Sequence, residues 1–432
     1  MADQRAPGDP GEPVVLPPIV VTPSDTPKVG TGTEAGAAAK AVSDFPPTIG
    51  VGGTNEAKGS FVIVIGGDKY DNVLQFRLTV SKEATTGVGQ FVLSWPGAED
   101  LNLTQGGGAT PGGASEVFKE CAKGAVYLDG QLARVFRLWS RTSQGTPTSF
   151  RLTVQFRGLA SDLVDSVPYH ESGQENNKTP KQIMEKVMEG FDSKVIDFAH
   201  FQRKIKRMVF GGETADRIMR RATRPYGLQY YETPEGNLAL RGYDDKEGSG
   251  QALTLGKNFT EWSVTREIVV QFRDIMVEGS DQPDVGNGKY GKQAEEIAGK
   301  ATNGKVGCQR RIVVRTDTEM DPDTLKKHSE MESDRRSMQG VFVTLKLSTW
   351  SDDSGKLWSI NKTHHVKIPI DQIDNDLLVT SVQFDLAREE RTTTMILTLD
   401  PEAPGSGGGV PNNPYTKDVK SEPDTGSGSA AP

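Results

Sequence analysis

The sequence contains little cysteine and few aromatic residues. Cys121 and Cys308 are the only cysteines in 432 residues, and aromatic residues make up 7%. Two cysteines are too few for a disulfide framework or a cysteine-based zinc site. We therefore expect two free, buried thiols and a fold that depends on packing alone.

Long apolar runs are also absent. The first residues, Met1–Arg5, lead into Pro- and Gly-rich sequence without the apolar core of a signal peptide. No run approaches the roughly 18 apolar residues that a membrane-spanning helix needs. We expect neither Sec-dependent export nor membrane anchoring.

The chain has no excess of positive charge. It carries 50 basic and 58 acidic residues, a net charge of −8. A protein that binds DNA by neutralising phosphates needs a basic surface, so sequence-independent nucleic-acid binding is disfavoured. One basic run, Arg203–Arg207, either contacts an acidic partner or forms a solvated strand or loop face, and we favour the solvated face.

Patterns that carry catalysis or metal binding are missing as well. None of the five histidines has metal-ligand spacing, and the adjacent His364 and His365 point to opposite faces of a strand. The acidic pairs Asp352–Asp353 and Asp371 with Asp374 could act on a glycan, but their turn-like surroundings favour solvated loop acids. We expect no enzyme, no catalytic residue, no metal and no cofactor.

Glycine and proline are abundant, with 48 and 25 residues, and both are enriched at the two ends. Residues 1–58 and 401–432 have too little apolar surface to offset the entropy of ordering, so we expect a flexible arm and tail. One apolar segment interrupts the arm. It is either a disordered apolar stretch or an edge strand that docks on a neighbouring subunit. Its predicted partner-binding residues are Val14, Val15, Leu16, Ile19, Val20 and Val21.

Short strands follow the arm. Apolar and polar residues alternate in Leu74–Ser81 and in Phe150–Arg157, which is typical of antiparallel strands with one solvated face. Further strands are predicted at Phe61–Gly66, Gln90–Trp95, Val126–Asp129 and Val135–Leu138. The glycine-rich segment Gly106–Gly113 lacks the context of a phosphate-binding loop and is predicted to be an ordinary loop.

The middle of the chain predicts an α+β module. Thr179 and Pro180 start one helix as N-cap and first residue, and a second helix follows Thr214 and ends before Gly227. A hairpin then surrounds the turn Thr233–Gly236.

Strand patterns return after this module. We predict strands at Glu261–Glu278, Arg310–Thr316, Val341–Trp350, Thr363–Ile370, Leu377–Leu386 and Thr393–Leu399. A polar helix at 322–339 interrupts them, and its few apolar residues indicate that it lies on a surface or against a partner.

The two β regions resemble each other. Each ends with three strands in the same order and approximate spacing, which predicts two similar small β-barrels around the module. The alternative is that antiparallel meanders in general look alike. The fold class is therefore α+β, mainly β, with two small antiparallel barrels and an inserted α+β module.

Several segments resemble the baseplate hub protein of Mu-like contractile-tail phages. The segments are Phe61–Gly67, Phe91–Gly97, Phe156–Ser166, Lys178–Ile183, Gly212–Ala215, Tyr226–Leu228, Pro234–Leu238, Phe259–Val264, Trp350–Asn361 and Leu377–Val379. They occur in the family's order between about Phe61 and Pro401. The arm and the tail have no recognised counterpart.

The resemblance implies a homotrimer whose two tube-type barrels per chain form a ring of six. Its implied partners are the tail tube protein or a tube-end adaptor, the trimeric spike and baseplate wedge proteins, with phage DNA passing through without specific binding. It implies a location in the virion tail baseplate and assembly in the host cytoplasm. A cell-wall-degrading tail hub enzyme and the hub of a tail-like secretion or injection device are the alternatives.

The predicted domain boundaries follow from these patterns. They are an arm at 1–58, a first tube-type barrel at 59–168, the module at 169–243, a second barrel at 244–400 and a tail at 401–432.

Overall fold

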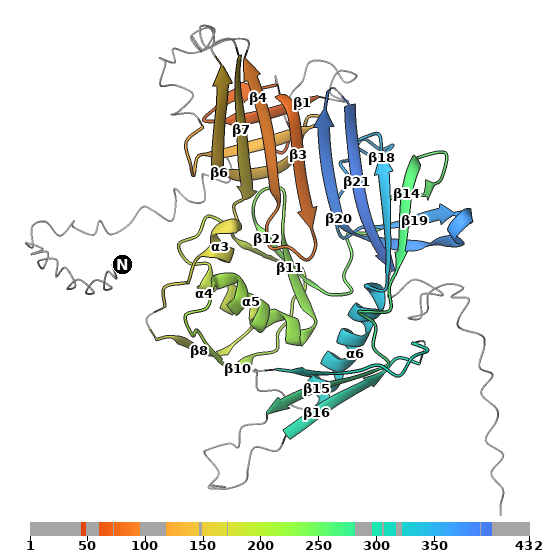
Figure 1. The fold of residues 1–432 in the computed structure, drawn as a ribbon. Helices are drawn as coiled ribbons and strands as arrows, with labels where there is room; N and C mark the ends of the chain where they lie inside the picture. Colours follow the sequence, from red (N-terminus) through yellow and green to blue (C-terminus); the bar gives the residue numbers. More distant parts are fainter. Residues whose placement is uncertain are drawn as a thin grey trace, which may run out of the picture. The chain divides into compact units, whose positions relative to one another are not determined.

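The computed structural model describes ten segments of the chain (Figure 1). They are residues 45–48, 60–71, 73–95, 118–146, 149–170, 172–280, 296–304, 306–316, 322–388 and 390–399. The predicted partner-binding residues Val14–Val21, the loop Gly106–Gly113 and the tail 401–432 lie outside them.

Strands predominate in the first part, and short helices appear in the middle. The strands are β1 Phe61–Ile65, β2 Asp68–Tyr70, β3 Val73–Ser81, β4 Val88–Trp95, β5 Lys123–Leu128, β6 Gln131–Thr146 and β7 Ser149–Gly158. The middle contains α3 Ser161–Asp165, β8 Gln174–Lys178, α4 Pro180–Val187, β9 Val195–Asp197, β10 Ile205–Val209, α5 Ala215–Thr223, the 3₁₀ turn η4 Arg224–Tyr226, β11 Leu228–Glu232 and β12 Leu238–Gly242.

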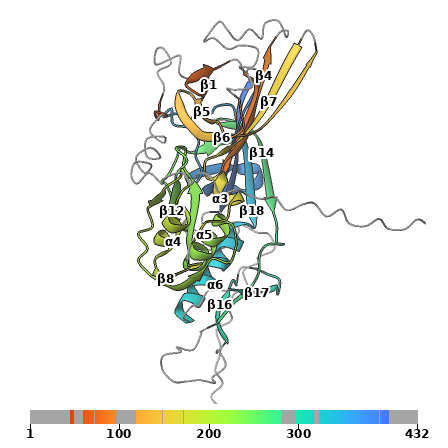
Figure 2. The ribbon, with the colours of Figure 1, turned by 90° about the vertical axis from the view of Figure 1, so that its left-hand side faces the viewer.

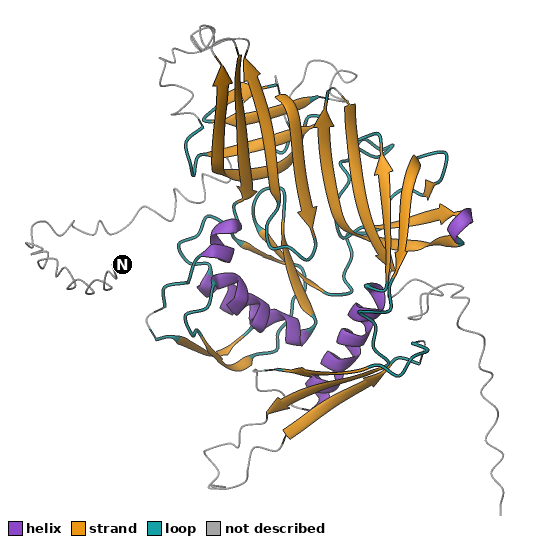
Figure 3. Ribbon diagram, viewed as in Figure 1, coloured by secondary structure: helices purple, strands orange, loops and turns teal. Residues whose placement is uncertain are grey.

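The last part is again built mainly of strands. It contains β13 Leu253–Thr254, β14 Phe259–Arg266, β15 Asp274–Ser280, β16 Glu296–Thr302, β17 Arg311–Arg315, α6 Pro322–Met338, β18 Val341–Leu347, β19 Thr363–Ile368, the 3₁₀ turn η6 Pro369–Asp371, β20 Ile373–Ala387 and β21 Glu390–Leu399. The predicted α+β, mainly β class is confirmed (Figure 3).

One sheet of 13 strands contains all strands of the first β region and most strands of the second. Its order is β14-β18-β21-β20-β3-β4-β7-β6-β5-β1-β2, with β19 paired to β20 and β13 paired to β19. The prediction of two closed barrels is therefore wrong. β3 pairs with β4 on one edge and with β20 of the other region on its second edge, so no edge of β3 remains to close the first region. β6, β7 and β4 run side by side in both views (Figure 2).

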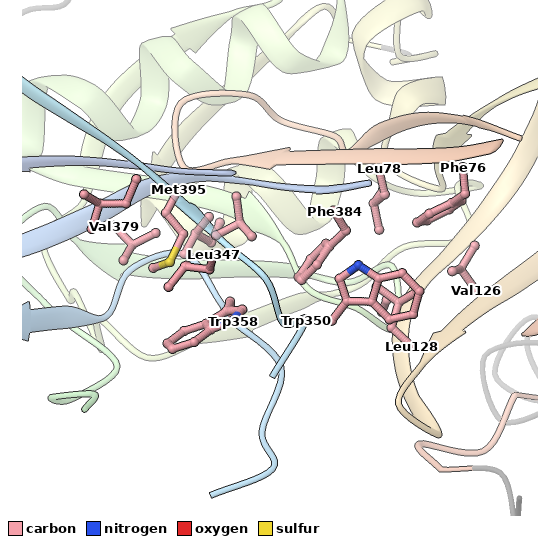
Figure 4. Close-up of a cluster of buried hydrophobic side chains, with 14 of the residues drawn as sticks. Phe76, Leu78, Val126, Leu128, Leu347, Trp350, Trp358, Val379, Phe384 and Met395 are labelled. Atoms are coloured by element: carbon pink, nitrogen blue, oxygen red, sulfur yellow. The ribbon is translucent and has the colours of Figure 1, made fainter. Parts of the chain in front are cut away.

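One continuous core supports this sheet. Phe76 and Leu78 of β3 lie in the same cluster as Trp350 and Phe384 from the last part of the chain (Figure 4). The indole of Trp350 is 1% exposed and its ring centroid lies 6.3 Å from that of Phe61. Burial of such aromatic side chains stabilises the shared core, so the two regions are joined by packing as well as by strand pairing.

The α+β module has a core of its own, and its helices begin as predicted. The Thr179 side chain accepts a hydrogen bond from the Gln182 amide, and the Gln182 side chain accepts one from the Thr179 amide, which completes a capping box. Ile183 and Val187 of α4 pack with Ile218 of α5 in this core. The hairpin β11–β12 forms as predicted and extends to β9 in a three-stranded sheet.

Helix α6 and three strands form a further layer. β15 pairs with β16 and β17, and α6 packs on this sheet. The prediction of one strand at Glu261–Glu278 is wrong, because β14 and β15 belong to different sheets on either side of a turn. One face of the polar helix, including Leu325 and His328, is buried, whereas the sequence predicted a helix on a surface or against a partner.

Other predictions have mixed outcomes. Both cysteines are free, but Cys121 is exposed and Cys308 is half-buried, so the expectation of buried thiols is wrong. The basic run lies partly in β10, and Lys204, Lys206 and Arg207 are exposed, as expected for a solvated face. Residues 45–48 at the end of the predicted arm contact the first region, since Thr48 pairs with Gln131. Among the described residues, no helix is long and apolar enough to cross a membrane.

Candidate functional site: two open strand edges on a repeated sheet

The large sheet contains the same five-strand unit twice. In the first half the order is β3-β4-β7-β6-β5, and in the second half it is β14-β18-β21-β20-β19. Every neighbouring pair within both units is antiparallel. The predicted similarity of the last three strands of each region therefore extends to all five.

The two units also share two register shifts. The register shifts between Val73 and Gln75 in β3, and between Phe259 and Glu261 in β14. It shifts again between Leu138 and Ser140 in β6, and between Val379 and Ser381 in β20. Bulges bend a strand at a defined position, so these matched shifts align the two halves residue by residue.

The halves meet where β3 pairs with the C-terminal half of β20. Arg77 lies opposite Asp385, and its Nε donates to the carboxylate at 2.7 Å. Thr79 lies opposite Gln383 and donates to its side-chain oxygen at 3.3 Å. Beneath them Leu78 and Phe384 are opposite each other and buried (Figure 4). Backbone pairing, polar cross-strand contacts and a buried layer make this a complete strand junction.

The strands equivalent to this junction each have an open edge. β14, the counterpart of β3, pairs with β18 and ends the sheet. β6, the counterpart of β20, pairs with β5 only up to Arg137, so its later residues have β7 alone as a neighbour among the described strands. An unpaired strand edge presents N–H and C=O groups to a partner strand. These two edges are the candidate site.

A buried ion pair attaches the first half of the sheet to the α+β module. Arg134 of β6 and Glu232 of β11 lie 3.1 Å apart, with 2% and 1% of their side chains exposed. The Glu232 carboxylate also accepts from the amides of Ala160 at 2.9 Å and Gly87 at 3.1 Å. Burial raises the pKa of Glu232, against the opposing effect of Arg134 and these donors.

The histidines behave as structural residues. His364 is 2% exposed and hydrogen-bonds through Nδ1 to the Gln251 carbonyl, and burial lowers its pKa. His365 faces outward between Asp374 and Asp376, and hydrogen bonding to Asp376 raises its pKa most. In the described ranges, no group of three or more His, Cys, Asp or Glu residues is placed to hold a metal ion.

The acidic pairs have local roles. Asp352 accepts hydrogen bonds from the amides of Ser354 and Lys356 in a turn, and these bonds contribute to its lowered pKa. Asp371 accepts from the indole N–H of Trp262 at 2.7 Å, and Asp374 pairs with Lys367 at 3.2 Å. Asp352 and Asp371 are turn acids, as the sequence predicted, whereas Asp374 lies in β20 and not in a loop.

The predicted partner-binding segment lies outside the described residues, so the structure brings none of its residues together. Sequence reasoning missed the open edges of β14 and β6. A signal is present in the sequence: apolar and polar residues alternate in Glu261–Thr265, as they do in Leu74–Ser81. The predicted strand Glu261–Glu278 hid this signal because it continues past the end of β14.

Comparison with known proteins gives a consistent result. Residues 160–242 match the family model described as "Baseplate hub protein gp44-like, second domain". The baseplate hub protein gp44 of Escherichia phage Mu is 22% identical over 292 residues, which cover 66% of this chain and 72% of that protein.

Two solved structures share the fold. The 43 kDa tail protein of prophage MuSo2 from Shewanella oneidensis has a TM-score of 0.66 and 20% identity, covering 78% of this chain and 98% of that one. The tail protein from Neisseria meningitidis MC58 has a TM-score of 0.63 and 15% identity, covering 79% and 97%. Together these findings confirm the predicted resemblance of this chain to the baseplate hub proteins of Mu-like phages.

Proposed function

We propose that the protein is a structural baseplate hub of a phage tail or of a related tail-like device. The resemblance to the hub protein gp44 of phage Mu supports this assignment, as does the match of residues 160–242 to the second domain of that family. Its location would be the baseplate of the virion tail, after assembly in the host cytoplasm. The segments 59–168, 169–243 and 244–400 would act as first barrel-like unit, module and second unit.

The single observation that carries the mechanism is the repeat within the sheet. Two equivalent units in one chain give a trimer six similar units around one axis, which matches a sixfold partner on one side and a threefold partner on the other. We propose a homotrimer that joins the tail tube protein or a tube-end adaptor to a trimeric spike, with wedge proteins outside and DNA passing along the axis. The net charge of −8 suits a conduit that DNA does not adhere to.

The repeat also specifies how copies would join. Within one chain, β3 pairs with the later part of β20. The equivalent contact between chains is β14 of one copy with the later part of β6 of the next. Transfer of the internal register places Ser263 opposite Gln144, and Thr265 opposite Thr142. All four side chains are exposed, and small polar pairs of this kind suit cross-strand contact.

Light scattering on the purified full chain tests the assembly. We expect a mass of three chains for the wild type. Thr142→Glu combined with Thr265→Glu places like charges directly opposite each other and should yield monomers. Thr142→Lys with Thr265→Glu should restore the trimer. A wild-type monomer at all concentrations, or a trimer unaffected by the double Glu variant, would reject this arrangement.

Electron microscopy of the tail tip tests the assignment itself. Labelled copies of the protein should lie at the junction of tube and spike. A clearing assay on purified cell walls addresses the enzymatic alternative, and lysis would contradict a purely structural role.

A further inference from the structure

A cavity of about 770 Å³ lies where several parts of the chain meet. The end of β3, the segment from α5 through η4 to β11, the helix α6, and the strands β20 and β21 all contribute to its wall. Its volume is typical of sites for small molecules, about 300–1,000 Å³. The hub role proposed above does not use this cavity, and no residue of β14 or β6 lines it.

The wall of this cavity has an excess of positive charge, although the whole chain has a net charge of −8. One lysine and six arginines line it, together with only two carboxylates, those of Glu83 and Glu332. A concave site with an excess of one charge attracts a ligand of the opposite charge.

Five of the six arginines have a carboxylate partner. Arg335 and Arg336 both pair with Glu332, at 2.8 and 2.7 Å. The other three pair with acids that do not line the cavity: Arg220 with Asp216 at 2.7 Å, Arg221 with Glu213 at 3.3 Å, and Arg315 with Glu278 at 3.2 Å.

The sixth arginine, Arg224 at the start of η4, differs from the others. Its side chain forms no ion pair and no hydrogen bond with any described residue. Burial, Arg220 and Arg335 lower its pKa, in that order of size. Tyr230 and Glu83 oppose this shift by smaller amounts. A guanidinium beside other cations is electrostatically unfavourable, and a bound anion would offset that effect.

A second group in the wall lacks a partner. His328 of α6 is 9% exposed, and its Nδ1 has no hydrogen-bond partner among the described residues. Buried polar atoms are nearly always hydrogen-bonded, so an unpaired atom in a cavity wall indicates a ligand that completes the site. Burial lowers the pKa of His328, so its ring is neutral at neutral pH and Nδ1 can carry a proton to donate.

These two groups lie near each other. A Cβ added to Gly227, the C-cap of η4, would lie 3.3 Å from the Met331 sulfur, so η4 packs directly on α6. His328 precedes Met331 by three residues and therefore lies on the same face of the helix. The charge of Arg335 lowers the pKa of both Arg224 and His328, which places both groups close to one cation.

The chemistry of the two groups favours a phosphate. A guanidinium binds two oxygens of an oxyanion side by side, and this contact uses both oxygens of a carboxylate. A tetrahedral phosphate keeps a further oxygen for the imidazole N–H. The apolar side chains of Pro225, Met331 and Met338 also line the cavity and can contact an organic group attached to the phosphate.

We propose that this cavity binds a small organic phosphate, and that Arg224 and Nδ1 of His328 hold its phosphate group. Arg220 and Arg335 attract the anion from a distance while they keep their own partners. The bound phosphate connects η4 of the α+β module with α6. All of these residues belong to one chain, so binding depends neither on trimer formation nor on the proposed hub role.

Isothermal titration calorimetry with phenyl phosphate tests the site in the full-length protein. Benzoate, at the same ionic strength, is the matched probe, because it carries a carboxylate on the same ring and should bind at least about tenfold more weakly. Arg224→Gln and His328→Phe each remove a hydrogen bond to a charged group and should weaken binding of phenyl phosphate about tenfold or more. Arg217→Gln is the control, since Arg217 is on α5 with 75% of its side chain exposed and does not line the cavity.

Arginine modification locates the bound anion. Phenyl phosphate should slow the labelling of Arg224 by phenylglyoxal at least about threefold and leave the labelling of Arg217 unchanged. Because Arg224 has no partner in the described structure, Arg224→Gln should unfold at the same temperature as the wild type without ligand, so a loss of binding would not reflect misfolding. Absence of phenyl phosphate binding, equal binding of benzoate, or unchanged binding in Arg224→Gln would overturn the proposal.

Discussion

The two halves of the large sheet fill equivalent core positions with opposite combinations of side chains. In the first half, Gly89 lies opposite Phe156, whereas the equivalent pair in the second half is Val343 and Leu397. Likewise Gly124 lies opposite Phe136, and the equivalent pair is His364 and Leu377. The strand pairing is the same in both halves, but in the first half one strand has a glycine and its neighbour a large side chain, whereas in the second half both strands have side chains of intermediate size.

The phenylalanine rings leave room only for glycine at positions 89 and 124. A Cβ on Gly89 would lie 2.3 Å from the Phe156 ring, and one on Gly124 would lie 2.5 Å from the Phe136 ring. An aromatic ring can cover a glycine on the neighbouring strand and fill the space that its missing side chain leaves. Because pairs rather than single residues are maintained, the halves share a backbone while their residue identity is low.

The halves differ in one connection as well. Between β3 and β4 the chain makes a short turn, whereas between β14 and β18 it includes β15, β16, β17 and α6. Both connections contribute to the wall of one cavity, through Lys82 and Glu83 on one side and α6 on the other. The same scaffold therefore carries two different attachments at equivalent positions.

The largest effect is expected where only the first half has a buried ion pair. Glu232→Gln leaves Arg134 charged and without its partner in the core, and should lower the free energy of unfolding by about 3–5 kcal/mol. In the second half, Asn375 occupies the position equivalent to Arg134. Asn375→Ala should change the free energy of unfolding by no more than about 0.5 kcal/mol. Urea denaturation monitored by tryptophan fluorescence measures both. Similar losses of unfolding free energy in the two variants would show that the buried ion pair does not distinguish the halves.

The next effect comes from converting a first-half pair into its second-half equivalent. Gly89→Val alone forces a side chain into the Phe156 ring and should cost about 2–3 kcal/mol. Gly89→Val with Phe156→Leu recreates the Val343–Leu397 pair and should recover at least half of that cost. A double-mutant cycle from thermal unfolding gives the coupling. Additive costs would contradict the idea that volume is exchanged within pairs.

A smaller effect is expected on the pH dependence of stability, and it arises in the second half only. The buried His364 has a lowered pKa, so the unfolded chain binds a proton more readily than the folded chain below the ordinary histidine pKa of 6.5. Stability should therefore fall as pH drops below about 6.5, and His364→Gln should flatten this dependence. The buried His328 acts in the same direction and remains in the variant. A pH profile that His364→Gln leaves unchanged would contradict the assignment.

The smallest effect is expected at the internal junction. Arg77 and Asp385 form an ion pair with 56% and 18% of their side chains exposed. Partly exposed pairs contribute little, so a double-mutant cycle with alanine should give about 0.5 kcal/mol. A coupling above about 2 kcal/mol would mean that this pair, rather than the buried layer of Leu78 and Phe384, holds the halves together.

Local patterns made much of the fold predictable. The alternation in Leu74–Ser81 and Phe150–Arg157 identified β3 and β7, and the Thr179–Pro180 start identified α4. β16 was missed because Glu296–Thr302 has Ala, Gly and Lys where a strand usually has large apolar residues. The buried pair of Arg134 and Glu232 gave no local signal, since charged residues in strands are usually exposed.

Local sequence patterns could not predict whether each β region closes into a barrel. Whether β3 closes its own region or joins another depends on a strand about three hundred positions later in the sequence. No periodicity within either strand distinguishes these partners, because both expose the same backbone groups. The matching bulges of the two halves, which identify equivalent residues, are features of strand pairing and leave no pattern in either strand alone.

Disulfide trapping tests the central claim that the β14 edge pairs with β6 of the next copy in the register of the internal junction. The test protein has Cys121 and Cys308 replaced by serine, and carries Ser263→Cys with Gln144→Cys. Residues directly opposite in an antiparallel pair have Cβ atoms about 4.5–5.5 Å apart, which allows a disulfide after small adjustment. Oxidation should give covalent dimers and trimers on a denaturing gel.

The matched control joins Ser263→Cys with Ser140→Cys, which the same register places four residues, or about 13 Å, away. We predict covalent oligomers for the first pair and none for the control. Equal crosslinking of the two pairs, or none with either pair in a protein that still forms trimers, would contradict the account.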